Sequence, residues 1–161
     1  MIRPYRESDL AAVVALFTDS VHGLACEHYD AAQLAAWAPR PPALDHWRER
    51  LSGRKTLVAE MDAKLAGFIT YEEDGHVDLL YVSPAYSRAG IASALLRKAE
   101  DVLASAGASE LFTEASKTAR PFFERHGFRV TEEQNVELRG AVFRRYAMRK
   151  TVAQRPLDGD S

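Results

Sequence analysis

The spacing of apolar residues changes along the chain between the two-residue period of β-strands and the 3.6-residue period of α-helices. Short apolar runs bounded by turn residues predict strands at residues 1–5, 55–61, 65–71, 76–82, 110–116, 128–138 and 141–148. Apolar positions three and four residues apart predict helices at residues 8–23, 31–38, 44–51, 91–107 and 118–126. The chain is therefore expected to belong to the α/β class.

The order of these elements indicates how the sheet is built. Asp74-Gly75 is a strong hairpin signal, and the strands at residues 55–82 should form an antiparallel meander. The helix at residues 91–107 crosses over the sheet, which makes the strands before and after it parallel. The sequence thus predicts a mixed, mainly antiparallel central sheet of about seven strands, with helices on both faces.

Composition limits the function classes further. The 161 residues are 47% hydrophobic and 27% charged, which fits one soluble domain at residues 1–150, followed by a polar, disordered tail at 151–161. The net charge of −2 and the lack of a long basic run argue against a nucleic-acid partner. No apolar run is long enough to span a membrane and no signal peptide is evident, so we expect a cytoplasmic protein. The single cysteine, Cys26, excludes an internal disulfide and a cysteine zinc site, and no metal is expected.

One stretch, residues 78–107, reads as a strand, a turn and a long amphipathic helix. Ser83-Pro84 ends the strand, and the small-residue turn at 87–92 leads into the helix. The first turn of such a helix leaves backbone N–H groups unpaired and carries the positive end of the helix dipole. This arrangement is typical of a phosphate site. The dinucleotide and P-loop fingerprints are absent.

Two segments resemble motifs of the GNAT acetyltransferase superfamily. Ser87-Arg88-Ala89-Gly90-Ile91-Ala92 is similar to its acyl-CoA pyrophosphate signature, and Ala119 to Phe128 is similar to its A-x-x-F-Y-x-x-x-G-F segment. Both occur in the family's order, and the resemblance covers about residues 1–150. It implies an acyl-CoA N-acyltransferase fold in which the strands at 76–82 and 110–116 splay apart. It also implies acetyl-CoA as a cosubstrate in the cleft between them.

The resemblance implies a set of residues that bind the cofactor. Backbone N–H groups from Arg88 to Ser93 should hold the phosphates, with the Arg88 side chain, unless Arg88 is simply a solvated surface residue. The signature usually begins with Gln or Arg, and Ser87 in that place shifts the electrostatic role to Arg88 and the helix terminus. A backbone N–H near Tyr81 or Val82 should polarise the thioester carbonyl. The predicted cofactor-binding residues are Leu80, Tyr81, Val82, Arg88, Ala89, Gly90, Ile91, Ala92, Ser93, Ser116, Phe123 and Arg125.

The base that takes a proton from the acceptor is expected on the strand at 76–82. A period of two places His76, Asp78, Leu80 and Val82 on one face. Asp78 is preferred, because it lies deeper than His76 and burial raises the pKa of a carboxyl group. The competing interpretations are a structural hydrogen bond for Asp78 and an exposed strand end for His76.

The acid that protonates the leaving thiolate is less evident. The family usually has a tyrosine at the position of Phe123, and phenylalanine cannot donate a proton. Ser116 is one replacement, although it could equally cap the next helix. Tyr81 or Tyr86 is another. We favour departure of the thiolate without a protein acid, because a thiol is a good leaving group.

The acceptor side is expected in the first two helices, where His22, Tyr29, Gln33 and Trp37 are the candidate substrate residues. Tyr29, Gln33 and Trp37 are four residues apart and share a helical face if the helix begins near Tyr29, which suits an amine bound by cation–π contact. Packing of Trp37 onto the sheet is the alternative. His22 and His28 lack a third partner at metal-ligand spacing.

These observations favour an N-acetyltransferase that moves an acetyl group from acetyl-CoA to a primary amine of a small molecule or peptide by direct attack. Cys26 lies outside the motifs, which argues against a covalent enzyme intermediate. A catalytically weak acyl-CoA-binding sensor or partner protein is the alternative, kept open by Ser87 and Phe123. An O-acyltransferase and a homodimer also stay open.

Overall fold

The structure is a computed structural model, and it describes residues 1–152. The strands are β1 Ile2–Pro4, β2 Lys55–Met61, β3 Lys64–Tyr71, β4 His76–Val82, β5 Glu110–Ser116, β6 Arg129–Leu138 and β7 Ala141–Thr151. The helices are α1 Leu10–Leu24, α2 Ala31–Trp37, α3 Leu44–Leu51, α4 Ile91–Ser105 and α5 Arg120–Arg125, with short 3-10 turns at Glu7–Asp9 and Pro84–Tyr86. The predicted elements are therefore all present.

The strands form one seven-stranded sheet in the order β1-β2-β3-β4-β5-β7-β6. β4 and β5 are parallel, because α4 crosses over between them, and the other neighbours are antiparallel. The predicted fold class, a mixed and mainly antiparallel sheet with helices on both faces, is confirmed.

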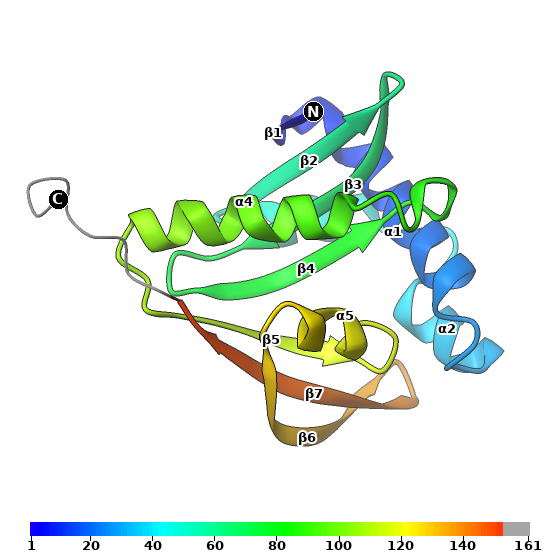
Figure 1. Ribbon diagram of the computed structural model, residues 1–161. Helices are drawn as coiled ribbons and strands as arrows, with labels where there is room; N and C mark the ends of the chain where they lie inside the picture. The colour runs from blue at the N-terminus through cyan, green and yellow to red at the C-terminus, as the bar shows by residue number, and fades with distance from the viewer. Residues whose placement is uncertain (153–161) are drawn as a thin grey trace, which may run out of the picture.

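β4 and β5 pair at one end and then separate. Their register covers His76 with Phe112 and Val77 with Thr113. Figure 1 shows the two strands diverging from this end toward α1 and α2. The sheet is thus open in its middle, as the family resemblance implied.

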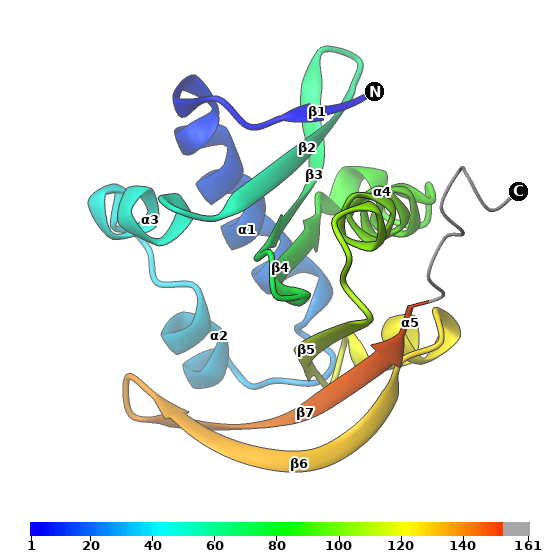
Figure 2. The same ribbon diagram turned by 90° about the vertical axis from the view of Figure 1, so that its left-hand side faces the viewer.

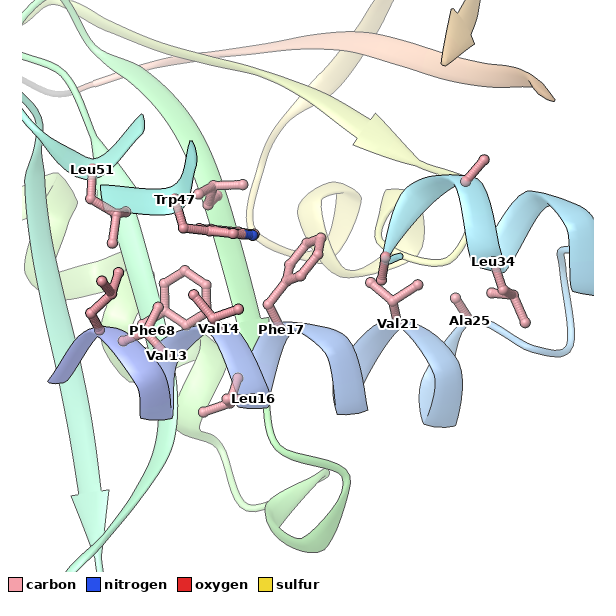
Figure 3. Packing of buried hydrophobic residues seen from close by; sticks show 14 of the residues in the cluster. Val13, Val14, Leu16, Phe17, Val21, Ala25, Leu34, Trp47, Leu51 and Phe68 are labelled. Carbon is pink, nitrogen blue, oxygen red and sulfur yellow. The ribbon is translucent and has the colours of Figure 1, made fainter. Parts of the chain in front are cut away.

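Two hydrophobic clusters hold the layers together, one on each face of the sheet. α1 and α3 pack on one face, and Figure 3 shows Phe17 of α1 pointing toward Trp47 of α3, with ring centroids 4.6 Å apart. α4 packs on the opposite face through buried residues such as Leu95 and Leu103. Figure 2 shows α1 and α4 on either side of the strands. The open gap between β4 and β5 therefore lies between two firmly packed layers.

The folded part of the chain extends slightly beyond the predicted domain end. Thr151 still pairs with Glu110 at the end of β7. Val152 is buried, and its N–H donates to Ser109 O at 2.9 Å. These two residues of the expected tail belong to the domain, and residues 153–161 lie outside the described part of the chain. Within residues 1–152, no helix is both long and apolar enough to cross a bilayer.

Candidate active site

The turn before α4 has the geometry of an anion cradle. Gly90 caps the helix with a φ of +78°, in the left-handed region that glycine adopts without strain. The Ala94 N–H makes the first bond of the helix, to Gly90 O, so the amides of Ile91 to Ser93 have no carbonyl partner within α4. A Cβ at Gly90 would meet no atom within 4 Å, so the space above these amides is open. A phosphate group fits the residues present here.

A hollow of about 370 Å³ lies over this turn and reaches into the gap between β4 and β5. A volume of this size falls within the range typical of ligand pockets, about 300–1,000 Å³. Every predicted cofactor-binding residue except Ala89 lines it. The Ala89 N–H is directed elsewhere, because it donates to Tyr86 O at 3.3 Å. We call this space the cofactor hollow.

The directions of the peptide groups along β4 determine which of its backbone amides face the gap between β4 and β5. The Ser83 N–H donates to Ala66 O at 2.8 Å, toward β3. Peptide groups alternate in direction along a strand, so the amide of Tyr81 also faces β3. The amides of Leu80 and Val82 face the open side. Of the two residues predicted to polarise a carbonyl, Val82 has the suitable direction.

A second hollow, of about 180 Å³, continues from the first through the gap in the sheet. The two share Trp37, Leu80, Tyr81, Ser116, Ala119 and Phe123. The second also has aromatic walls from Tyr29 and Phe143, with the carboxylates of Asp78 and Glu114. We call it the acceptor hollow, since it faces the cofactor hollow across the splayed strands.

A β-bulge at Asp78 corrects the predicted strand faces. Thr70 of β3 pairs with Leu79, and its neighbour Tyr71 pairs with Val77, so Asp78 is the extra residue. The bulge resets the alternation, and Leu79 then packs on the α1 side while Leu80 and Val82 pack on the α4 side. His76, Asp78, Leu80 and Val82 therefore do not share one face. The bulge aims Asp78 away from α4, toward the acceptor hollow.

Asp78 is a nearly buried carboxylate with two arginine neighbours. Its side chain is 14% exposed, and its oxygens lie 3.5 Å from Arg50 Nη2 and 3.6 Å from Arg54 Nε. Its Oδ2 atom is buried and, among residues 1–152, accepts no hydrogen bond. A buried carboxylate oxygen without a donor is costly unless a ligand group supplies one. This geometry makes Asp78 available to a donor N–H of an acceptor.

His76 is bonded through both ring nitrogens. Nδ1 donates to Glu72 Oε1 and Nε2 donates to Glu114 Oε1, each at 2.8 Å. The bond to Glu114 is the main cause that raises the pKa of His76 to about 9, and in turn the imidazolium lowers the pKa of Glu114. At neutral pH the ring is therefore charged and has no lone pair to accept a proton. The prediction of His76 as a base is thus not supported, and its role here is to clasp β4 to β5.

Replacing His76 by phenylalanine is expected to lower the free energy of unfolding by about 2 kcal/mol at pH 7. Because the pKa of His76 is higher in the folded than in the unfolded protein, its protonation stabilises the fold. This stabilisation is complete at pH values below the unfolded-state pKa of about 6.5, and it is lost as the pH rises through about 9. The difference between the two proteins should accordingly shrink at alkaline pH. Urea unfolding across this pH range measures the difference in the free energy of unfolding between the two proteins. A difference independent of pH would contradict charged hydrogen bonds from His76 to Glu72 and Glu114.

The comparisons with known proteins identify the family. A model of the GNAT acetyltransferase domain matches residues 25–150. An Escherichia coli K12 protein described as an uncharacterized N-acetyltransferase, YafP, is 40% identical over 151 residues, covering 92% of this chain and 93% of that protein. The chain belongs to the GNAT acetyltransferase family.

Solved structures agree with this assignment. A GCN5-related N-acetyltransferase from Rhodopseudomonas palustris has a TM-score of 0.90 at 30% identity and covers 94% of each chain. PaiA N-acetyltransferase from Thermoplasma acidophilum, solved in complex with coenzyme A, shares the fold with a TM-score of 0.71 at 20% identity, over 94% of this chain and 98% of that one. The GNAT fold thus extends over nearly the whole chain.

The position of the usual GNAT acid is occupied by a core residue. Phe123 is 4% exposed and packs edge-on against Phe128, with ring centroids 5.1 Å apart. Ser116 Oγ accepts the Ala119 N–H at 3.1 Å in the turn before α5, but the N-cap residue of α5 is Ala119 and not Ser116. The Tyr86 hydroxyl points toward Asp62, at 3.5 Å. None of these side chains gives this GNAT protein an evident acid.

Tyr81, like Ser116, carries a hydroxyl group and lines both hollows. Burial raises its pKa to about 12, so the phenol keeps its proton at neutral pH. It could donate a hydrogen bond to a ligand but is a poor source of a full proton. This is consistent with departure of a thiolate without a protein acid.

The four predicted acceptor residues divide into two pairs. Tyr29 and Trp37 line the acceptor hollow, with ring centroids 5.2 Å apart. Tyr29 also accepts the Lys117 N–H at 2.9 Å, and burial raises its pKa. Gln33 instead donates to Val142 O at 3.0 Å, and His22 lies 2.9 Å from Ala38 O. Gln33 therefore fastens α2 to β7, and His22 fastens α1 to the end of α2; neither lines the hollow, so the structure does not support their predicted role.

Proposed function

We propose that this GNAT protein transfers the acetyl group of acetyl-CoA to a primary amine of a small molecule or peptide by direct attack. The observation that carries the proposal is the continuity of the two hollows. One lies over the anion cradle before α4, the other contains Asp78, and they meet in the gap between β4 and β5. The PaiA structure, which shares the fold and was solved with coenzyme A, supports the choice of cosubstrate.

Each group of the site has a distinct role in this proposal. The free amides of Ile91 to Ser93 and the Arg88 side chain would hold the phosphates of acetyl-CoA, the acetyl donor. The Val82 N–H would donate to the thioester carbonyl oxygen as negative charge develops on it. Asp78 would accept a proton from the acceptor amine, whose nitrogen bonds to the carbonyl carbon as the carbon–sulfur bond breaks. The electron pair of that bond leaves on sulfur, so the charge balances without a covalent enzyme intermediate.

Calorimetric titration with acetyl-CoA tests the cofactor part of the proposal directly. Binding in the micromolar range is expected, and it should disappear for a truncated acetyl-pantetheine that lacks the 3′,5′-ADP portion, because the cradle would have no phosphate to hold. A thiol-release assay with a panel of primary amines then tests transfer. Equal binding of both forms, or no binding of either, would contradict the phosphate assignment.

The second candidate is a catalytically weak acyl-CoA-binding protein, which the buried Phe123 in place of an acid favours. It predicts tight acetyl-CoA binding with no thiol release above background for any amine or alcohol. Release with alcohols in place of amines would instead indicate an O-acyltransferase.

A further inference from the structure

A third hollow opens beyond Asp78, on the side away from the cofactor. It lies between the segment that joins α2 to α3 and the turn that joins β6 to β7, and we call it the outer chamber. It shares Trp37, Asp78, Glu114 and Arg145 with the acceptor hollow, so the two are continuous. In Figures 1 and 2 the β6–β7 turn lies beside α2. An acceptor bound at Asp78 would extend into this space.

The carboxylates of the outer chamber already have cationic partners. Asp78 is paired with Arg50 and Arg54, at 3.5 and 3.6 Å. Glu114 accepts a bond from the His76 ring, which is charged at neutral pH. Their negative charge is therefore matched without the remaining arginines of the chamber.

Two arginines of the outer chamber, Arg139 and Arg145, are held by neutral groups. Arg139 Nη1 donates to Ala36 O at 2.7 Å, and Arg145 Nε donates to Gln134 Oε1 at 2.7 Å. Among residues 1–152 neither guanidinium forms an ion pair with a carboxylate. Both line the chamber. Within residues 1–152 they bring two positive charges to it that form no ion pair, although the charge of Arg145 contributes to lowering the pKa of Glu114.

The bonds that hold these arginines leave most of their donors unused. The Arg139 bond also caps the C-terminal end of α2, where carbonyl groups lack helical partners, but it uses one of five N–H groups. The Arg145 bond uses Nε–H and leaves both terminal nitrogens. A guanidinium fixed in direction with free N–H groups is well suited to a carboxylate or phosphate, which it can bind through two parallel bonds.

We propose that the outer chamber is an anion subsite of the acceptor, so that the substrate carries a primary amine and a carboxylate or phosphate in one molecule. Arg139 and Arg145 bind the anionic group, while the amine lies at Asp78. This inference rests on the proposed function, since it assigns the far end of the same acceptor site. It excludes polyamines and simple alkylamines as preferred substrates, because they would place a neutral or cationic group against two unmatched arginines.

Matched pairs of amines test the subsite. O-phosphoethanolamine is compared with ethanolamine, and leucine with isoamylamine, which lacks only the carboxylate. Each is titrated by calorimetry into the CoA-loaded protein and assayed for acetylation with acetyl-CoA. In at least one pair, the member with the carboxylate or phosphate is expected to bind about ten- to a hundredfold more tightly than its counterpart without it and to show a correspondingly lower KM. A preference limited to the phosphate or to the carboxylate pair identifies which anion is bound.

Arg139→Gln and Arg145→Gln should remove this preference, leaving the affinity for acetyl-CoA unchanged. Arg129→Gln, which removes an exposed charge at the far end of β6, is the control and should keep the preference. Equal affinity for both members of each pair, or variants that weaken the binding of both members equally, would overturn the subsite. If acetyl-CoA still binds in that case, the proposed function stands. Failure to bind acetyl-CoA would refute both.

Discussion

Replacing Asp78 by asparagine is expected to lower kcat by about 10²- to 10⁴-fold, while the affinity for acetyl-CoA stays nearly unchanged. Asparagine has the same shape but cannot accept a proton from the amine. Asp78 lines the acceptor hollow and the outer chamber but not the cofactor hollow, so binding of the cosubstrate should not depend on it. Steady-state kinetics and calorimetry on the same preparation measure the two quantities.

The controls for this variant must separate the loss of the proton acceptor at Asp78 from the loss of its negative charge. Arg50 and Arg54 lose their carboxylate partner in Asp78→Asn, and urea unfolding should show whether the fold tolerates this. Glu72→Gln removes a neighbouring carboxylate that bonds His76 but does not line the acceptor hollow, so it should retain kcat. A variant Asp78→Asn with unchanged kcat, or with kcat and acetyl-CoA affinity reduced in equal proportion, would remove Asp78 as the base.

Replacing Gly90 by glutamate is expected to abolish acetyl-CoA binding, weakening it by more than about a hundredfold. The new carboxylate would occupy the cradle where the phosphates are bound and would repel them. A Cβ at this position meets no atom within 4 Å, so the substitution should not disturb packing. Calorimetry measures the affinity, and circular dichroism checks that the fold is retained.

Gly90→Asn is the matched control, because asparagine tolerates the φ of +78° better than other residues and adds no charge. It should bind acetyl-CoA much more tightly than Gly90→Glu does. If Gly90→Glu binds acetyl-CoA normally, the turn before α4 is not the phosphate site. If both variants lose binding equally, backbone strain and not charge is responsible.

Local sequence patterns were sufficient for the fold and for grouping most of the predicted cofactor-binding residues around one hollow. The period of the hydrophobic residues predicts whether each element is a helix or a strand. The turn before α4, which is proposed to hold the phosphates, lies within one continuous segment around Gly90. Its proposed role in holding phosphates depends on backbone amides, which follow from the start of a helix and not from distant partners. For this reason nearly all the predicted cofactor-binding residues line one hollow.

The acceptor side could not be predicted in the same way, because it depends on residues brought together from distant segments. The bulge at Asp78 arises from the register between β3 and β4, which no local pattern encodes. The charge of His76 depends on Glu114 of the neighbouring strand. Arg139 and Arg145 enter from the last hairpin, and only the structure shows that neither forms an ion pair with a carboxylate of residues 1–152.

The short register between β4 and β5 has a consequence for the cohesion of the molecule. The half-sheets β1–β4 and β5–β7 share ladder pairs at one end, and at the other Tyr29 and Gln33 tie the N-terminal helices to Lys117 and Val142. A ligand lying in the gap would touch both half-sheets where few backbone bonds join them. Binding of such a ligand would thus stabilise the association of the two half-sheets for as long as the ligand is bound.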